Sequence, residues 1–262
     1  AVDCRFGDCI SLDTKHIIAW VKENNPKVYI EGKRYDKSTQ PAGDPDCRLG
    51  CKSKTNQHKK HNAVESIPMP TPLKNPVPAA GLEIGEYYWG YGSGVVATKV
   101  ADWGEFVLAE LTQPFDQPDV SYFNPLLLQV EKRLGFKPRF GALDAAFDAF
   151  YVYEYFNISG GFAAVPFVER GQKGKRQFDD KGAPFCQAER PMTLKYTFRC
   201  KTTLIQHERG RYVCSLLHPT ANGEICPIQH KNWKKGGCIS TIATSPGARL
   251  RYQLDRDSEA YK

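Results

Sequence analysis

Two aspartates stand in surroundings that suit metal-dependent chemistry. Asp13 lies within the apolar run Cys9–Trp20, and Asp144 lies within the apolar run Phe140–Phe150. A carboxylate inside such a run is costly unless it meets a proton, a base or a metal. If each aspartate leaves a strand at one edge of the same sheet, the two carboxylates could hold divalent cations together. The alternative is local, with Asp13 capping a strand end near Lys15 and Asp144 serving as the N-cap of a following helix.

Five cysteines suit a different metal. They recur at gaps of 12 to 14 residues, at Cys186, Cys200, Cys214, Cys226 and Cys238. Four of the five thiolates could form a tetrahedral zinc site. The set contains no Cys-x2-Cys pair, so ordinary buried or exposed thiols are the alternative. A second set of potential zinc ligands comprises Cys47, Cys51, His58 and His61. Its spacing differs from that of the common zinc finger, and a basic phosphate-binding loop is the alternative.

The use of cysteine also bears on location. The chain has nine cysteines, an odd number, and shows no secretory signal pattern. This usage indicates a reducing compartment, with thiols or metal ligands rather than a framework of disulfides. We therefore expect a cytoplasmic protein.

Basic residues are concentrated between Arg170 and Arg251. This segment has 16 Lys and Arg against 5 Asp and Glu, a net charge of +11; the whole chain carries +7, which leaves −4 for the remainder. A basic block with interleaved aromatic residues indicates a polyanion partner, most often nucleic acid, and a solvated basic surface is the alternative. The candidates for contacts with a DNA backbone are Lys15, Arg48, Lys52, Lys231, Lys234 and Lys235.

Apolar periodicity indicates the elements that must position these residues. The 262 residues are 41% hydrophobic and 25% charged, which is typical of a soluble globular protein. No apolar run approaches the ~20 residues of a membrane span. Strands are predicted at 9–20, 86–100, 103–113, 138–143 and 161–168, and helices at 122–134 and 145–156. This order predicts an α/β fold in which helices flank a mixed sheet, with an irregular insert at about 21–84.

The same order, with one aspartate leaving the first strand and another leaving the fourth, resembles the RNase H-like core. Several segments are also similar to those of DDE transposases of bacterial insertion sequences. These segments are Ser11–His16, Asp44–Arg48, Trp89–Gly94, Leu143–Asp148 and Gly247–Tyr261. The resemblance covers nearly the whole chain.

The resemblance implies that three acidic residues bind two divalent ions, Mg²⁺ or Mn²⁺, which cleave and join DNA strands. The first two catalytic and metal-binding acids would be Asp13 and Asp144. Asp148, one helical turn later, is expected to be solvated or to support the site from outside. The partners would be the transposon ends and the target DNA. The resemblance further implies a homo-oligomer when active, association with the nucleoid and no membrane partner.

The third acid of the family is a Glu in a Tyr-x2-Arg-x3-Glu pattern on a helix. Tyr261 matches its first position, but the sequence ends before the Arg, and Glu259 comes too early. We therefore expect a fragment truncated at both ends and inactive by itself. Alternatives are an RNase H-like nuclease without strand transfer, or a non-catalytic zinc- and DNA-binding remnant of a decayed element.

The expected division of the chain follows. Residues 1–168 would form the catalytic core with its insert, and residues 169–248 a basic, cysteine-rich insertion. Residues 249–262 would begin the truncated C-terminal catalytic helix, with Asp257 or Ser258 as its N-cap.

Overall fold

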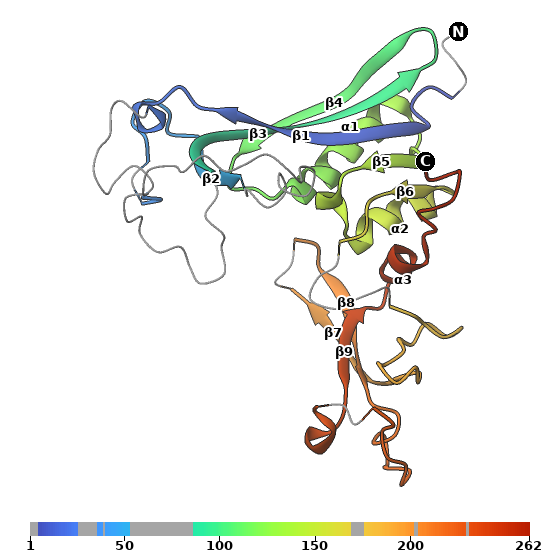
Figure 1. Cartoon of the computed structure of the whole chain (residues 1–262). Coiled ribbons are helices and arrows are strands. Elements are labelled where there is room, and N and C mark those ends of the chain that lie inside the picture. The colour runs from blue at the N-terminus through green and yellow to red at the C-terminus, as the bar shows by residue number, and fades with distance from the viewer. Residues whose placement is uncertain are drawn as a thin grey trace, which may run out of the picture. The chain divides into compact units, whose positions relative to one another are not determined.

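A computed structural model describes residues 5–25, 36–38, 40–52, 86–168, 176–201, 204–228 and 231–262 (Figure 1). The main sheet contains β1 (Cys9–Ile18), β2 (Arg48–Lys52), β3 (Glu86–Val100), β4 (Gly104–Pro114), β5 (Phe140–Leu143) and β6 (Phe162–Ala164). A second sheet contains β7 (Thr193–Cys200), β8 (His207–Val213) and β9 (Ile239–Ala243). The α-helices are α1 (Phe123–Leu134), α2 (Phe150–Ile158) and α3 (Pro246–Gln253). Short 3-10 helices occupy Lys22–Asn24, Asp119–Tyr122, Ala145–Phe147 and Trp233–Lys235.

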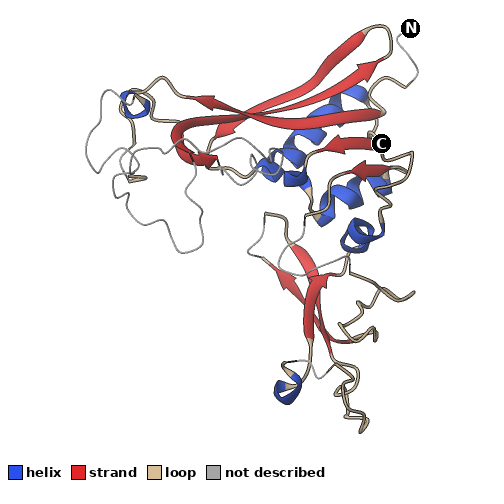
Figure 2. Cartoon of the chain, in the orientation of Figure 1, coloured by secondary structure: helices blue, strands red, loops and turns tan. Residues whose placement is uncertain are grey.

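The main sheet mixes parallel and antiparallel strands (Figure 2). Its strand order is β2-β3-β1-β5-β6, and β4 also pairs with β3. Strands β1, β5 and β6 are parallel to one another, and β2 is antiparallel to β3. Strand β3 runs opposite to β1, because Thr98 donates a hydrogen bond to the Cys9 carbonyl and Ala19 donates one to the Trp89 carbonyl. The predicted α/β fold, a mixed sheet flanked by helices, is confirmed.

The chain forms two compact units. The first comprises residues 1–13, 96–109 and 123–262, and the second comprises residues 14–95 and 110–122. Strands β1, β3 and β4 each contribute residues to both units. In the second unit, buried side chains form a core that consists of Ala19, Val21, Cys47, Leu49 and Trp89.

Helix α1 belongs to the first unit and follows the predicted pattern. It buries Phe123, Leu126, Leu127 and Val130, which recur with helical spacing. It ends at Gly135, whose φ of +78° suits the left-handed C-cap conformation that glycine adopts most readily. Phe156 of α2 meets Phe123 edge-to-face and also covers Gly141 of β5, so the packing of both helices reaches the sheet.

The second sheet also belongs to the first unit. Its strands are antiparallel in the order β7-β8-β9. Helix α3 follows β9 and packs closely on α2, since a Cβ at Gly247 would collide with the carbonyl oxygen of Phe150. Apolar periodicity did not predict these three strands.

Three predicted elements differ from the structure. The helix expected at 145–156 is split into a 3-10 turn and α2, because Asp148 turns inward and Ala149 is extended. The strand expected at 161–168 is limited to β6. Turns occupy residues 256–261, where a helix start was expected. There the Asp257 N–H donates to the Asp255 carboxylate and the Ser258 hydroxyl donates to the Asp255 carbonyl. Over the described part of the chain, every helix falls short of the length and apolar character that crossing a bilayer requires.

Candidate functional site

Asp13 and Asp144 occupy neighbouring positions on two parallel strands. The last registered pair of β1 and β5 joins Leu12 to Leu143, and each aspartate is the next residue along its strand. Both leucines are buried and both aspartates are exposed, as the alternation of side chains along a strand requires. Neighbouring strands lie about 4.8 Å apart, so the backbones of Asp13 and Asp144 leave this registered pair on adjacent strands. A cation shared by the two carboxylates stays a prediction.

The two aspartates differ in their local setting. Asp144 directly follows β5, whereas β1 continues beyond Asp13 to Ile18, so Asp13 lies inside its strand rather than at the end. The Asp144 Oδ1 atom accepts a hydrogen bond of 2.9 Å from the Ala146 N–H and caps the 3-10 helix. A carboxylate has two oxygens and about four acceptor positions, so this capping role and cation binding are compatible.

Asp148 is buried and does not belong to this exposed pair. Of the two expected roles, a solvated group is therefore wrong, and support of the site from outside stays a prediction. Its carboxylate accepts hydrogen bonds of 2.7 and 2.5 Å from Arg251. It also accepts one of 2.7 Å from the Tyr153 hydroxyl and one of 2.9 Å from the Val168 N–H. Burial raises the pKa of Tyr153, and the hydrogen bond to Asp148 raises it further. Asp148 therefore joins α3 to the segment before α2. Local sequence patterns could not predict this ion pair, because the partner is 103 positions away.

The predicted basic residues lie on exposed segments. Lys15 is exposed on β1, and Lys231, Lys234 and Lys235 are exposed in and before the 3-10 helix Trp233–Lys235. The Arg48 guanidinium donates to the carbonyls of Pro45 and Cys47 at 2.9 and 2.8 Å, so it braces its own loop. Lys52 is the last residue of β2, and its side chain is outside the part of the structure that is described. A role for these residues in binding DNA stays a prediction.

His16, which is close to Asp13 in the sequence, packs against aromatic side chains. The His16 ring packs against Phe115, with ring centroids 4.2 Å apart, and lies near Tyr88. His58 and His61, the histidines of the shorter zinc pattern, fall outside the described residues. Cys47 of the same pattern is buried and hydrogen-bonds through its thiol to the Asp44 carbonyl at 3.2 Å.

The five spaced cysteines divide into two groups. Cys200 ends β7 and pairs with His207, whereas Cys214 follows the other end of β8. Cys214 and Cys226 share a small buried cluster, against which Cys238 packs. None of the eight described cysteines forms a disulfide. Within the described ranges, no group of three or more His, Cys, Asp or Glu side chains is placed so that it could hold a metal ion.

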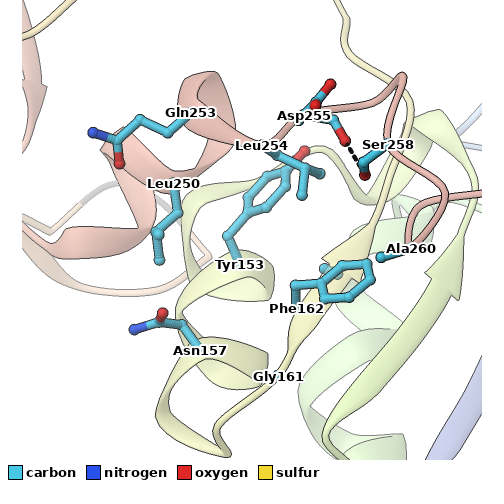
Figure 3. A pocket seen from close by; sticks show the side chains of 11 residues that line it. Tyr153, Asn157, Gly161, Phe162, Leu250, Gln253, Leu254, Asp255, Ser258 and Ala260 are labelled. Carbon is cyan, nitrogen blue, oxygen red and sulfur yellow. Dashed lines mark hydrogen bonds between the residues drawn. The ribbon is translucent and has the colours of Figure 1, made fainter.

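A pocket of about 300 Å³ lies among α2, β6 and the segment after α3 (Figure 3). Apolar groups from Phe162, Leu250 and Leu254 form much of its lining, and Asp255 supplies a carboxylate at its rim. Local sequence patterns could not predict this pocket, because its walls come from segments that are far apart in the chain.

Comparison of the chain with models of protein families, with curated proteins and with solved structures finds no significant match.

Proposed function

We propose that this chain contains the catalytic core of a DDE-type DNA transposase. In this proposal Asp13 and Asp144 bind divalent metal ions that cleave DNA strands and join them to a target. The observation that supports it is the register of β1 and β5, in which each exposed aspartate directly follows a member of the buried pair Leu12 and Leu143.

The topology of the main sheet supports an RNase H-like core. In that core, three successive antiparallel strands are followed by two strands parallel to the first, with helices between the later strands. Here β1, β3 and β4 are the antiparallel strands, and β5 and β6 are parallel to β1. Helix α1 precedes β5, and α2 lies between β5 and β6. Asp13 lies on the first of these strands, and Asp144 directly follows the fourth.

The chemistry requires hard, negatively charged ligands. Two Mg²⁺ or Mn²⁺ ions about 3.5–4 Å apart can activate the attacking oxygen and stabilise the leaving oxygen of a phosphodiester. Such ions prefer carboxylate oxygens and keep part of their water shell. Two carboxylates bind such ions only weakly, so the proposed site needs a third acidic ligand beside Asp13 and Asp144.

The basic segment supports DNA as the partner. The net charge of +11 between Arg170 and Arg251 accompanies exposed Lys231, Lys234 and Lys235. Lysines that neutralise phosphates release bound counterions, so DNA affinity should fall steeply with salt. Replacing the three lysines with Gln should reduce that salt dependence.

The test is a strand-cleavage assay on the full-length protein with Mg²⁺ or Mn²⁺. Asp13→Ala and Asp144→Ala should each reduce cleavage to background, whereas Asp102→Asn, in the exposed turn after β3, should leave it unchanged. Cleavage retained by both alanine variants would refute the mechanism. Joined products distinguish a transposase from an RNase H-like nuclease that only cuts.

A non-catalytic protein is the second candidate, because Asp144 already has a local role as the cap of the 3-10 helix. Asp144→Asn separates the two roles, since an asparagine oxygen can still accept the Ala146 N–H but carries no charge. If Asp144 only caps the helix, Asp144→Asn should behave like the wild type in every metal- and DNA-dependent measurement.

A further inference from the structure

Two cysteines are cross-strand neighbours at one end of the second sheet. Val213, the last residue of β8, pairs with Ile239, the first residue of β9. Cys214 comes directly after Val213 and Cys238 directly before Ile239, so the antiparallel register sets them side by side. Thr193, the start of β7, pairs with Val213 at the same end of the sheet. This end therefore gathers segments that lie far apart in the sequence.

Two glycines before Cys238 allow the backbone to pass close to Cys214. A Cβ added to Gly237 would lie 2.6 Å from the Cys214 Cβ and 3.2 Å from its Sγ, so no larger residue fits there. Gly236 and Gly237 have φ values of +98° and +79°, which glycine adopts without strain. They lead the chain from the 3-10 helix Trp233–Lys235 directly into Cys238.

Cys186 and Cys226 reach the same place from two other segments. Cys186 is the first residue of a hydrogen-bonded turn. Its carbonyl accepts a hydrogen bond of 3.0 Å from the Glu189 N–H, and its N–H donates one of 2.9 Å to the Arg190 carbonyl. The thiols of Cys186 and Cys214 are hydrogen-bonded to that of Cys238. Cys226 is buried in one apolar cluster with Cys214 and Leu216.

The surroundings of Cys238 disfavour its thiolate form. Burial raises the pKa of Cys238 to about 12, and the neighbouring Cys186 and Cys214 add to the rise. A buried thiolate is unfavourable without a nearby positive charge, and a bound cation supplies one.

Cys200 is separate from this group. It pairs with His207 at the opposite end of the β7–β8 ladder, seven residues beyond Thr193. At about 3.3 Å per residue, this places it roughly 23 Å from the end of the sheet that carries Cys214.

We infer that Cys186, Cys214, Cys226 and Cys238 form a structural zinc site and that Cys200 is not one of its ligands. Zinc prefers soft thiolates, and structural sites usually have four tetrahedral protein ligands. Binding would release one proton from each thiol to solvent and leave a complex of one Zn²⁺ and four thiolates. Among the described residues, no group of three or more His, Cys, Asp or Glu side chains lies in positions that could hold a metal ion, so the four thiols would have to move to bind zinc. The hydrogen bonds of Cys186 and Cys214 to Cys238 bring three of the four sulfur atoms close to one another.

The zinc site would connect the segment between Cys226 and Cys238, which carries three exposed lysines, to the second sheet. Cys226 precedes Lys231, Lys234 and Lys235, and Cys238 follows them. A metal that joins the two cysteines would close this loop and hold it against the end of β8. The inference does not depend on the proposed transposase function, because it concerns the stability of this sheet and loop.

Metal binding is tested on the complete 262-residue chain, purified under reducing conditions and titrated with Co²⁺ and then Zn²⁺. We expect one metal per chain, with the intense visible absorption of a tetrahedral cobalt–thiolate complex that Zn²⁺ then bleaches. Cys214→Ser and Cys226→Ser should each weaken zinc binding by at least about 10-fold. Loss of a residue that only hydrogen-bonds to a metal ligand already lowers metal affinity by about this factor. Cys200→Ser is the matched control and should bind zinc like the wild type. Equal losses in Cys200→Ser and Cys226→Ser, or no thiolate absorption in the wild type, would overturn the inference.

A second measurement avoids the risk that a serine variant fails to fold. Thiol alkylation of the wild-type chain, mapped by mass spectrometry, should show Cys186, Cys214, Cys226 and Cys238 protected by Zn²⁺ and exposed together by a chelator. The exposed Cys9 and Cys51 should react at the same rate in both conditions. A Cys214–Cys238 disulfide that persists under reducing conditions, or protection that ignores the chelator, would contradict a zinc site.

Discussion

Arg251 of α3 donates two parallel hydrogen bonds of 2.7 and 2.5 Å to the Asp148 carboxylate. Asp148 is the C-cap of the short 3-10 helix that begins after Asp144. The Asp148 side chain is fully buried, and that of Arg251 is 12% exposed. Arg251 also donates to the Val168 carbonyl and lies over the Phe167 ring. Because Asp144 and Asp148 belong to one short segment, the ion pair braces the backbone that carries a proposed metal ligand.

Loss of Arg251 should destabilise the protein strongly. Arg251→Leu should lower the free energy of unfolding by about 3–5 kcal/mol, because it leaves the Asp148 charge buried without its partner. The double variant Asp148→Leu/Arg251→Leu should cost less than the sum of the two single changes. Urea denaturation of the four proteins measures this coupling.

The matched control is the ion pair of Arg139 with Asp8, which is also bidentate but more exposed, with side chains 52% and 16% accessible. Arg139→Leu should cost only about 0–1 kcal/mol, as surface ion pairs do. Equal losses for Arg139→Leu and Arg251→Leu would show that burial does not set the strength of the Arg251 contact.

The same surface pair predicts a pH effect. The hydrogen bonds from Arg139 lower the pKa of Asp8 below its ordinary value. Because the folded-state pKa is depressed, the stabilisation is present above the unfolded carboxyl pKa of about 3.9 and is lost as the pH falls through the folded pKa. Titration by NMR should show a low Asp8 pKa that rises in Arg139→Leu, and an unchanged pKa would argue against the ion pair.

A small residue in β5 allows α2 to pack beside the candidate site. A Cβ at Gly141 would lie 2.6 Å from the Phe156 Cε2 atom, so Gly141→Ala should destabilise the protein by about 1–3 kcal/mol through overpacking. Gly43→Ala is the control, because a Cβ there meets nothing within 4 Å. Thermal unfolding of both variants checks the difference, and a neutral Gly141→Ala would contradict this packing.

Local patterns predicted part of the fold. Helix α1 and strand β3 match their predicted ranges almost residue for residue, because Phe123, Leu126, Leu127 and Val130 repeat with helical spacing and β3 is rich in aromatic and β-branched residues. The neighbouring positions of Asp13 and Asp144 could also be predicted, because each follows a buried apolar strand residue and parallel strands share an edge.

The rest depends on contacts that sequence does not reveal. Most of β7 is exposed, so it lacks the alternation that marks a half-buried strand. The burial of Asp148 could not be predicted, since its partner Arg251 is remote in the sequence. The C-terminal turns form because the Asp255 carboxylate accepts the Asp257 N–H, a local hydrogen bond that competes with helix formation.

The most direct test of the central claim is Mn²⁺ binding to this chain, followed by electron paramagnetic resonance of the free ion. We expect one weak Mn²⁺ site. Asp13→Asn and Asp144→Asn should each lower its affinity by at least about 10-fold, because loss of a residue that only supports a metal ligand already has an effect of about this size. The double variant should lose little more than either single variant, because one shared ion needs both carboxylates. Asp102→Asn should bind Mn²⁺ like the wild type. If Asp144→Asn binds Mn²⁺ as tightly as the wild type, Asp144 is only a helix cap and the metal site proposed for Asp13 and Asp144 is wrong.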